Sequence, residues 1–316
     1  MEIVPQRLTT ALLAASIAAL ALAPARAPAF ESSYLYNLST TTGTIRSSGV
    51  FLALDDKTKE VYVVGENQIR IFNETGMETF SFGGGPDLGT VVSLAPTETG
   101  DLLLLSLVGE RRAVLRTNFR GELVGEVELK GLPPELGELR FNAMGYAKGR
   151  IYLAELMGMR LVVVDAEGNF VAFHDLAEML EVGAKRTDYG IRGFRVAPNG
   201  EVLFTVQALF KAYVLSPDGN LRAFGKRGSA PGKFNVITGI AADEQGHYYV
   251  ADILKSAVLV FDKDFNWLKE FGYRGGRPGN LVSPVDLVAG DGKLYVSQYA
   301  RRGVAVFKVS DPRVGQ

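Results

Sequence analysis

Positively charged side chains recur where this chain is predicted to turn, and the chemistry they offer is the recognition of anions. Arginine grips carboxylate and phosphate groups through two nitrogen atoms, and lysine adds a compact positive charge. Nine such residues form the predicted partner-binding set: Arg112, Arg160, Lys211, Arg227, Lys255, Arg274, Arg277, Arg301 and Arg302. The alternative is that they solubilise the loops and pair with neighbouring Asp and Glu residues.

Residues suited to covalent or metal-assisted catalysis are scarce. The chain has no cysteine, which excludes a thiolate nucleophile, a lipid-attachment cysteine and a C-x-x-C-H haem site. Its two histidines, His174 and His247, are too few for a histidine-rich metal centre, and no Ser, His and Asp trio stands out. We therefore predict no catalytic residue, no metal site and no cofactor.

Asp252 ends a run of strand-forming residues, and Glu155 and Gln298 occupy the equivalent places in two other segments. Three oxygen-bearing side chains that converge on an axis could hold Ca²⁺. The other interpretation is that Asp252 stabilises its turn by accepting backbone hydrogen bonds, as aspartate commonly does. We favour this second interpretation.

An internal repeat sets the positions of these residues. FGKRGSAPGKF begins at Phe224 and FGYRGGRPGNL begins at Phe271, and six identities share the same offset of 47 residues (271 − 224). Within the unit, four short apolar runs are separated by turn sequences such as DEQG and DKDFN. Such runs predict four antiparallel strands, and a four-stranded unit that recurs every 40 to 50 residues is typical of a propeller blade.

Six segments match the second strand of such a blade, at residues 60–65, 101–106, 150–155, 201–206, 247–252 and 293–298. They predict an all-β fold, a six-bladed β-propeller of four-stranded antiparallel blades. The sixth blade lacks one strand. The short sequence after residue 308 contains Pro312, which cannot donate a backbone hydrogen bond to a neighbouring strand. We expect residues 33–38 to pair beside residues 304–308 and close the ring.

The repeat resembles the NHL repeat through PGKF (231–234), GIAAD (239–243), GHYYVAD (246–252) and VLVFD (258–262). The likeness is close over residues 224–310 and looser before them. It implies a six-bladed propeller, a scaffold found both in binding domains and in some enzymes. Similar propellers include calcium-dependent lactonases, the strictosidine-synthase-like group and amidating lyases with a histidine-rich zinc site.

The third blade carries an insertion at residues 174–183, where Asp175 is a plausible N-cap for one or two helical turns. The insertion could lean over the central tunnel or plug a gap, and we favour the plug.

Propeller geometry sorts the charges into two groups. Loops between second and third strands, and loops between blades, emerge at one pole, and the remaining turns emerge at the other. The nine predicted partner-binding residues fall at the first, which we call the basic pole. The opposite, acidic pole collects Asp55, Asp56, Asp243 and Asp262, among others. A near-neutral chain of net charge −1 would thus present a cationic end that attracts anions.

Residues 1–29 fit a secretory signal peptide: Arg7, an apolar run at 11–23, and cleavage after Ala29. The apolar run is shorter than the ~20 residues that cross a bilayer, and a retained membrane anchor is the alternative. The mature domain is then residues 30–316, exported to the periplasm or outside the cell. Since it has no cysteine, its stability must come from blade packing rather than from disulfides.

The sequence favours a non-catalytic binding or scaffold protein that recognises an acidic protein or an anionic polymer at the basic pole. It could act alone as a monomer or within a cell-envelope complex. We expect no nucleic-acid partner in that compartment and no membrane span after cleavage. The alternative is a calcium-dependent, lactonase-like hydrolase or a lyase with a tunnel-centred site.

Overall fold

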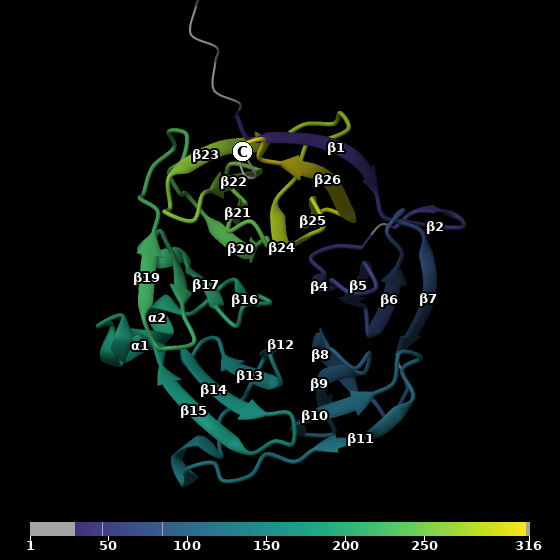
Figure 1. Ribbon diagram of the computed structural model, residues 1–316, viewed down its shortest axis with the longest axis vertical. Helices are drawn as coiled ribbons and strands as arrows, with labels where there is room; N and C mark the ends of the chain where they lie inside the picture. The colour runs from purple at the N-terminus through teal and green to yellow at the C-terminus, as the bar shows by residue number, and fades with distance from the viewer. Residues whose placement is uncertain (1–28, 46, 84, 314–316) are drawn as a thin grey trace, which may run out of the picture.

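The computed structural model of the chain describes residues 29–45, 47–83 and 85–313, so the predicted leader, apart from Ala29, lies outside the described residues. Six four-stranded sheets stand around a central axis (Figure 1). Strands pair antiparallel within every blade, which confirms the predicted fold class.

Each of the first three blades runs from the axis outwards in chain order. Blade one contains β4 (Phe51–Asp55), β5 (Glu60–Gly65), β6 (Gln68–Phe72) and β7 (Glu78–Gly83). Blade two contains β8 (Thr90–Pro96), β9 (Leu102–Val108), β10 (Arg111–Thr117) and β11 (Leu123–Val127). Blade three contains β12 (Ala143–Ala147), β13 (Arg150–Glu155), β14 (Arg160–Asp165) and β15 (Phe170–Asp175).

The remaining blades follow the same plan, except that the sixth borrows its outer strand. Blade four contains β16 (Phe194–Val196), β17 (Val202–Val206), β18 (Lys211–Leu215) and β19 (Leu221–Phe224). Blade five contains β20 (Ile237–Ala242), β21 (Tyr248–Asp252), β22 (Ala257–Phe261) and β23 (Trp267–Gly272). Blade six contains β24 (Pro284–Gly290), β25 (Lys293–Gln298), β26 (Val304–Ser310) and β1 (Glu31–Asn37).

Strand β1 completes blade six, as predicted. It pairs antiparallel with β26, from Glu31 opposite Ser310 to Asn37 opposite Ala305. Without it, β26 would present an open edge of unpaired backbone groups. A short hairpin, β2 (Ser39–Thr40) and β3 (Gly43–Thr44), then leads the chain into blade one.

The second and third strands of a blade are buried on both faces because each blade is sandwiched between two neighbours. This explains why they read as continuous apolar runs rather than alternating ones: every residue of β22 is buried. The described residues form six apolar clusters, one at each interface between adjacent blades.

The insertion after blade three plugs a gap, as we favoured. Asp175 caps α1 (Leu176–Met179) by accepting the backbone N–H groups of Ala177 and Glu178, each at 3.1 Å. Leu176 and Ala177 are buried in the cluster between blades three and four. The segment continues through η2 (Gly183–Lys185) and α2 (Arg186–Tyr189), and Figure 1 places α1 and α2 at the outer edge of the ring, away from the axis.

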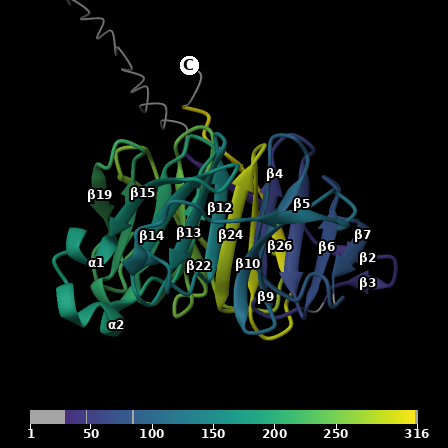
Figure 2. The ribbon, with the colours of Figure 1, turned by 90° about the horizontal axis from the view of Figure 1, so that it is seen from below.

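Two short 3₁₀ turns, η1 (Pro134–Leu136) and η3 (Gln207–Leu209), complete the helical elements. Among the residues that the structure describes, helices are at most four residues long and none could span a bilayer. Figure 2 shows the ring in profile, with the strands running between the two poles and α2 towards the lower, basic pole.

Candidate functional site

All nine predicted partner-binding residues lie at one pole of the ring. Lys255, Arg301 and Arg302 lie in the connections between second and third strands, and Arg112, Arg160 and Lys211 lie at the start of third strands. Arg227, Arg274 and Arg277 belong to the linkers between blades. The structure therefore places these nine cations at the pole that the strand topology predicts.

Two of the nine form ion pairs with carboxylates of the same chain. The Lys255 ammonium lies 2.8 Å from the carboxylate of Glu270, and its side chain is only 6% exposed. Arg160 lies 3.5 Å from Glu155. For these two residues the alternative interpretation, pairing with a neighbouring acid, describes the structure better.

The other seven have no carboxylate within 4.0 Å of their charged groups in the part of the chain that the structure describes. Arg227 stacks its guanidinium 5.0 Å from the centre of the Phe210 ring. Arg302 donates to the carbonyl of Gly275 at 3.3 Å. Arg274, Arg277 and Arg301 are exposed.

Three of these arginines line one groove at the basic pole. Arg277, Arg301 and Arg302 face a space of about 520 Å³ between the linker to blade six, the β25–β26 turn and β1. Asn37 and Asn280 add amide groups, and no carboxylate belongs to the described lining. A groove with three cations and no acid suits a carboxylate or phosphate group.

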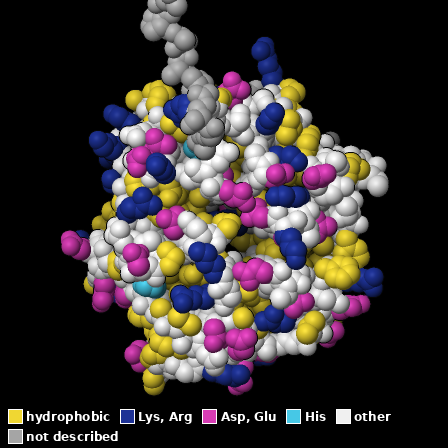
Figure 3. All heavy atoms as spheres, in the orientation of Figure 1, with side chains coloured by type: hydrophobic (Ala, Val, Ile, Leu, Met, Phe, Trp, Pro, Cys, Tyr) yellow, Lys and Arg dark blue, Asp and Glu magenta, His cyan; other side chains and the backbone are white. Residues whose placement is uncertain are grey.

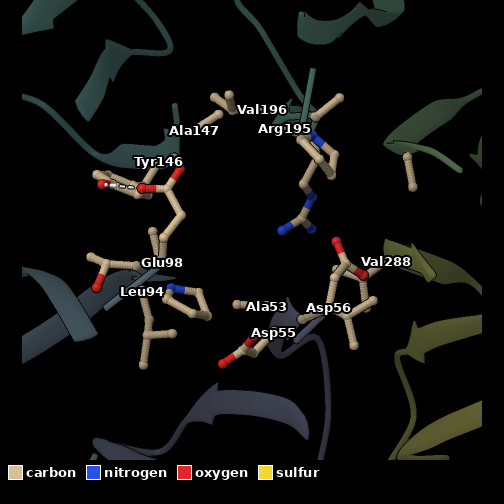
Figure 4. Close-up of a pocket in the computed structure, with 18 of the residues that line it drawn as sticks. Ala53, Asp55, Asp56, Leu94, Glu98, Tyr146, Ala147, Arg195, Val196 and Val288 are labelled. Atoms are coloured by element: carbon tan, nitrogen blue, oxygen red, sulfur yellow. Dashed lines mark hydrogen bonds between the residues drawn. The ribbon is translucent and has the colours of Figure 1, made fainter. Parts of the chain in front are cut away.

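A second hollow, the axial cavity, opens at the acidic pole. It measures about 300 Å³ and is lined by the ends of the innermost strands, with apolar walls that include Leu94, Val196 and Val288 (Figure 4). Asp55, Asp56 and Glu98 lie around it. Figure 3 shows this pole, where Asp and Glu side chains near the central depression are interspersed with Lys and Arg.

Two acids that line the axial cavity, Asp56 and Glu98, differ in their hydrogen bonding. Burial, reinforced by the charges of Glu244, Asp55 and Asp291, raises the pKa of Asp56 to about 6. Its Oδ1 is buried without a hydrogen-bond partner in the described chain. Glu98 accepts a hydrogen bond from the Tyr146 hydroxyl at 2.8 Å, and burial together with this bond raises the pKa of that tyrosine to about 12.

Arg195, which the sequence reasoning missed, lines the axial cavity from β16 and reaches two other blades. Its Nη1 donates to the Leu52 carbonyl at 2.6 Å, and its Nη2 donates to Asp286 and to the Leu287 carbonyl. Its guanidinium also lies over the Phe51 ring, 5.0 Å from the centre. Nothing in the local sequence FRVAPNG indicates these long-range partners.

Asp252 has the role that we favoured. Fully buried, it accepts backbone N–H groups of Asn235 (2.6 Å), Val236 (3.2 Å) and Lys255 (3.0 Å). Gln298 accepts from Val282. In these blades, the residue that ends the second strand thus holds the linker that precedes the blade.

Glu155 repeats this arrangement in blade three by accepting from the N–H of Arg140 at 3.2 Å. The oxygens of all three candidate calcium ligands therefore bind backbone amides and do not converge as an ion site. No group of three or more His, Asp or Glu residues in the described ranges is arranged to hold a metal.

His247 takes part in a hydrogen-bond network with two aspartates. It is buried, with Nδ1 2.8 Å from Asp243 and Nε2 3.1 Å from Asp311. Tyr249 donates to the same Asp243 oxygen at 2.7 Å, and Phe30 packs edge-on against the imidazole. The network ties blade five to both the segment before β1 and the segment after β26, so it supports ring closure.

The acidic pole owes part of its charge to turn chemistry. Asp165, Asp243 and Asp262 each begin a tight turn and accept backbone N–H groups from residues two and four positions later. Aspartate is favoured at such positions because its side chain satisfies these amides. These acids are explained by the fold, whereas Arg274, Arg277 and Arg301 at the opposite pole form no ion pair with a described carboxylate.

Comparisons with known proteins bear on the fold. No protein-family model matches the chain, and no curated protein matches it. Solved structures do resemble it. A Bacteroides thetaiotaomicron protein of unknown function has a TM-score of 0.63 at 13% identity, covering 89% of this chain and 77% of that one. Virginiamycin B lyase from Staphylococcus aureus has a TM-score of 0.55 at 15% identity, covering 90% and 89%.

A luciferin-regenerating enzyme is similar at a TM-score of 0.56 and 12% identity, covering 90% of this chain and 96% of that one. At such identities the likeness shows the fold alone. The chain is therefore a six-bladed β-propeller whose structural neighbours include lyases and proteins of unknown function.

Proposed function

We propose that this chain is an exported, non-catalytic binding propeller of the NHL-repeat type. In this proposal residues 1–29 are a leader, and the basic pole recognises an acidic protein or an anionic polymer, alone or within an envelope assembly. The observation that carries the proposal is the groove in which Arg277, Arg301 and Arg302 gather without an acid in its described lining.

The scaffold suits recognition by its loops. Six blades fix the ends of the loops rigidly, so cations in these loops are held in place before a partner arrives. The acids available for neutralisation mostly lie at the other pole, where several are held in turns. A partner that brings its own carboxylate or phosphate groups would supply the missing counter-charges.

The test compares two charge-reversal variants of the full-length protein, tagged at the C-terminus, because Asp311–Arg313 follow β26 at the acidic pole. The first variant replaces Arg274, Arg277, Arg301 and Arg302 with Glu. The control replaces an equal number of exposed acidic-pole cations with Glu: Lys57, Arg120, Arg150 and Lys263.

Affinity purification from native envelope extract should lose specific co-eluting partners with the first variant and retain them with the control. Raising the salt concentration should weaken capture by the unmodified protein, because charge pairs at a surface are screened. Equal capture of partners by the two variants would show that the basic pole is not the binding surface.

A second candidate is an enzyme that works at the axial cavity, a hydrolase or a lyase. The cavity favours it, since Asp56 and the Glu98–Tyr146 pair lie beside apolar walls. Glu155, Asp252 and Gln298 do not fit a calcium site there, because their oxygens accept backbone amides. Metal analysis, with lactone hydrolysis assayed with and without chelator, separates the candidates. Tightly held calcium and chelator-sensitive turnover would support the enzyme.

A further inference from the structure

Exposed large side chains lie among the cations of the basic pole, and three of them are on neighbouring loops of blades five and six. Leu254, in the β21–β22 turn, is 69% exposed. Tyr273 begins the linker to blade six and Tyr299 begins the β25–β26 turn, and both are also exposed. We call Leu254, Tyr273 and Tyr299 the apolar patch. Exposed apolar side chains scattered singly are ordinary, but large ones carried by loops that are bonded to one another offer a partner apolar contact area.

Hydrogen bonds tie the loops of this patch to one another. Tyr299 donates its backbone N–H to the Ser283 carbonyl at 3.1 Å, and Ser283 in turn donates to the Ser256 hydroxyl at 3.5 Å. Within the linker to blade six, the Leu281 N–H donates to the Tyr273 carbonyl at 3.1 Å. These bonds hold the three loops in fixed positions relative to one another, which lowers the entropy lost when a partner binds.

Arginines of the basic pole are close in sequence to the residues of the apolar patch. Arg274 follows Tyr273 directly, and Arg301 follows Tyr299 by two residues. Arg302 links these two loops by donating to the Gly275 carbonyl. Tyr and Arg are among the residues enriched at the energetically important centre of protein interfaces.

We infer that the partner is a protein segment that combines acidic with apolar side chains, its carboxylates entering the groove and its apolar residues covering the apolar patch. The inference rests on the proposed binding role of the basic pole and narrows it. An anionic polymer such as polyphosphate would bind the arginines but would make no apolar contact with Leu254. A protein segment with acidic and apolar side chains would contact both the arginines and Leu254.

The experiment selects displayed random peptides on the full-length protein and measures the Kd of the enriched peptides against three variants. Leu254→Ser removes the apolar anchor without changing charge, and Val124→Ser is its matched control. Val124 is 62% exposed on β11, in a blade on another part of the ring. The four-arginine reversal described above is the third variant. Polyglutamate and polyphosphate serve as purely anionic probes.

Enriched peptides should contain both acidic and apolar residues. Leu254→Ser should weaken them about tenfold or more, and Val124→Ser less than about twofold. Binding of polyglutamate should be unchanged by Leu254→Ser and lost in the arginine reversal. If anionic probes bind but no selected peptide depends on Leu254, the inference is overturned and the proposed function stands. If no anionic probe or peptide is sensitive to the arginine reversal, the proposed function itself fails.

Discussion

Nη2 of Arg195 lies 2.8 Å and 2.9 Å from the two carboxylate oxygens of Asp286, which joins blade four to blade six although blade five lies between them. The side chains are 14% and 17% exposed, so both charges are largely withdrawn from water. Asp286 also accepts the backbone N–H of Leu52, which brings blade one into the same contact. One ion pair thus connects three innermost strands near the axis.

Arg195→Met should therefore lower the free energy of unfolding by about 3 kcal/mol, because it leaves the Asp286 carboxylate largely buried without its cation. Arg111→Met is the matched control, since Arg111 pairs with Glu126 at the surface. An exposed pair contributes less than about 1 kcal/mol. Urea unfolding of both variants measures the difference. Equal losses would contradict the bracing role of Arg195.

His247 should make stability fall as the pH rises above neutrality. Burial opposes its charged form, but the hydrogen bonds and charges of Asp243 and Asp311 outweigh burial and raise its pKa above the ordinary 6.5. A raised pKa means that the stabilisation is complete below about pH 6.5 and is lost as the pH passes through the folded-state pKa. Urea unfolding at a series of pH values above 6.5 should show the decline.

His247→Gln should abolish this decline, and His174→Gln should leave it intact. Burial lowers the pKa of His174, so the contribution of that residue is present above pH 6.5 and is lost as the pH falls. The two histidines therefore act in different pH ranges. A decline that survives in His247→Gln would assign the effect to another group.

Asp252→Ala should destabilise the fold without altering metal content. Three backbone N–H groups lose their acceptor, and each unsatisfied buried group costs about 1–3 kcal/mol. We expect a loss of about 3 kcal/mol or more in urea unfolding, and a smaller one for Asp252→Asn, which keeps one carbonyl oxygen. Calcium that binds the unmodified protein and is released by Asp252→Ala would instead revive the ion-site interpretation.

A chain that starts at Leu38 should lose its monomeric, compact state. It lacks β1 and Phe30, so the edge of β26 is left unpaired and the cover of the His247 network is removed. Size-exclusion chromatography with light scattering should show aggregates or larger species, and thermal unfolding should begin at a lower temperature than for a chain that starts at Ala29. A stable monomer would show that the ring does not depend on β1.

The sequence by itself determined the number of blades, their strand order, the closing strand and the pole at which each loop emerges. These features follow from short-range causes: apolar runs of strand length, turn residues such as Asp243 and Asp262, and a repeat with an offset of 47 residues. Asp175 capped its helix for the same reason, because a cap needs partners only two or three residues away.

Only the tertiary structure decided which charged side chains form ion pairs within the protein and which do not. Lys255 looks like a rim cation in the sequence, yet Glu270 neutralises it inside the protein. Arg195 and Asp286 are 91 residues apart, and His247 and Asp311 are 64 apart. Such pairs form when folding brings distant strands together, and burial then fixes their energy. Local sequence contains neither the distance nor the burial, so the free arginines and the apolar patch could be identified only in the folded chain.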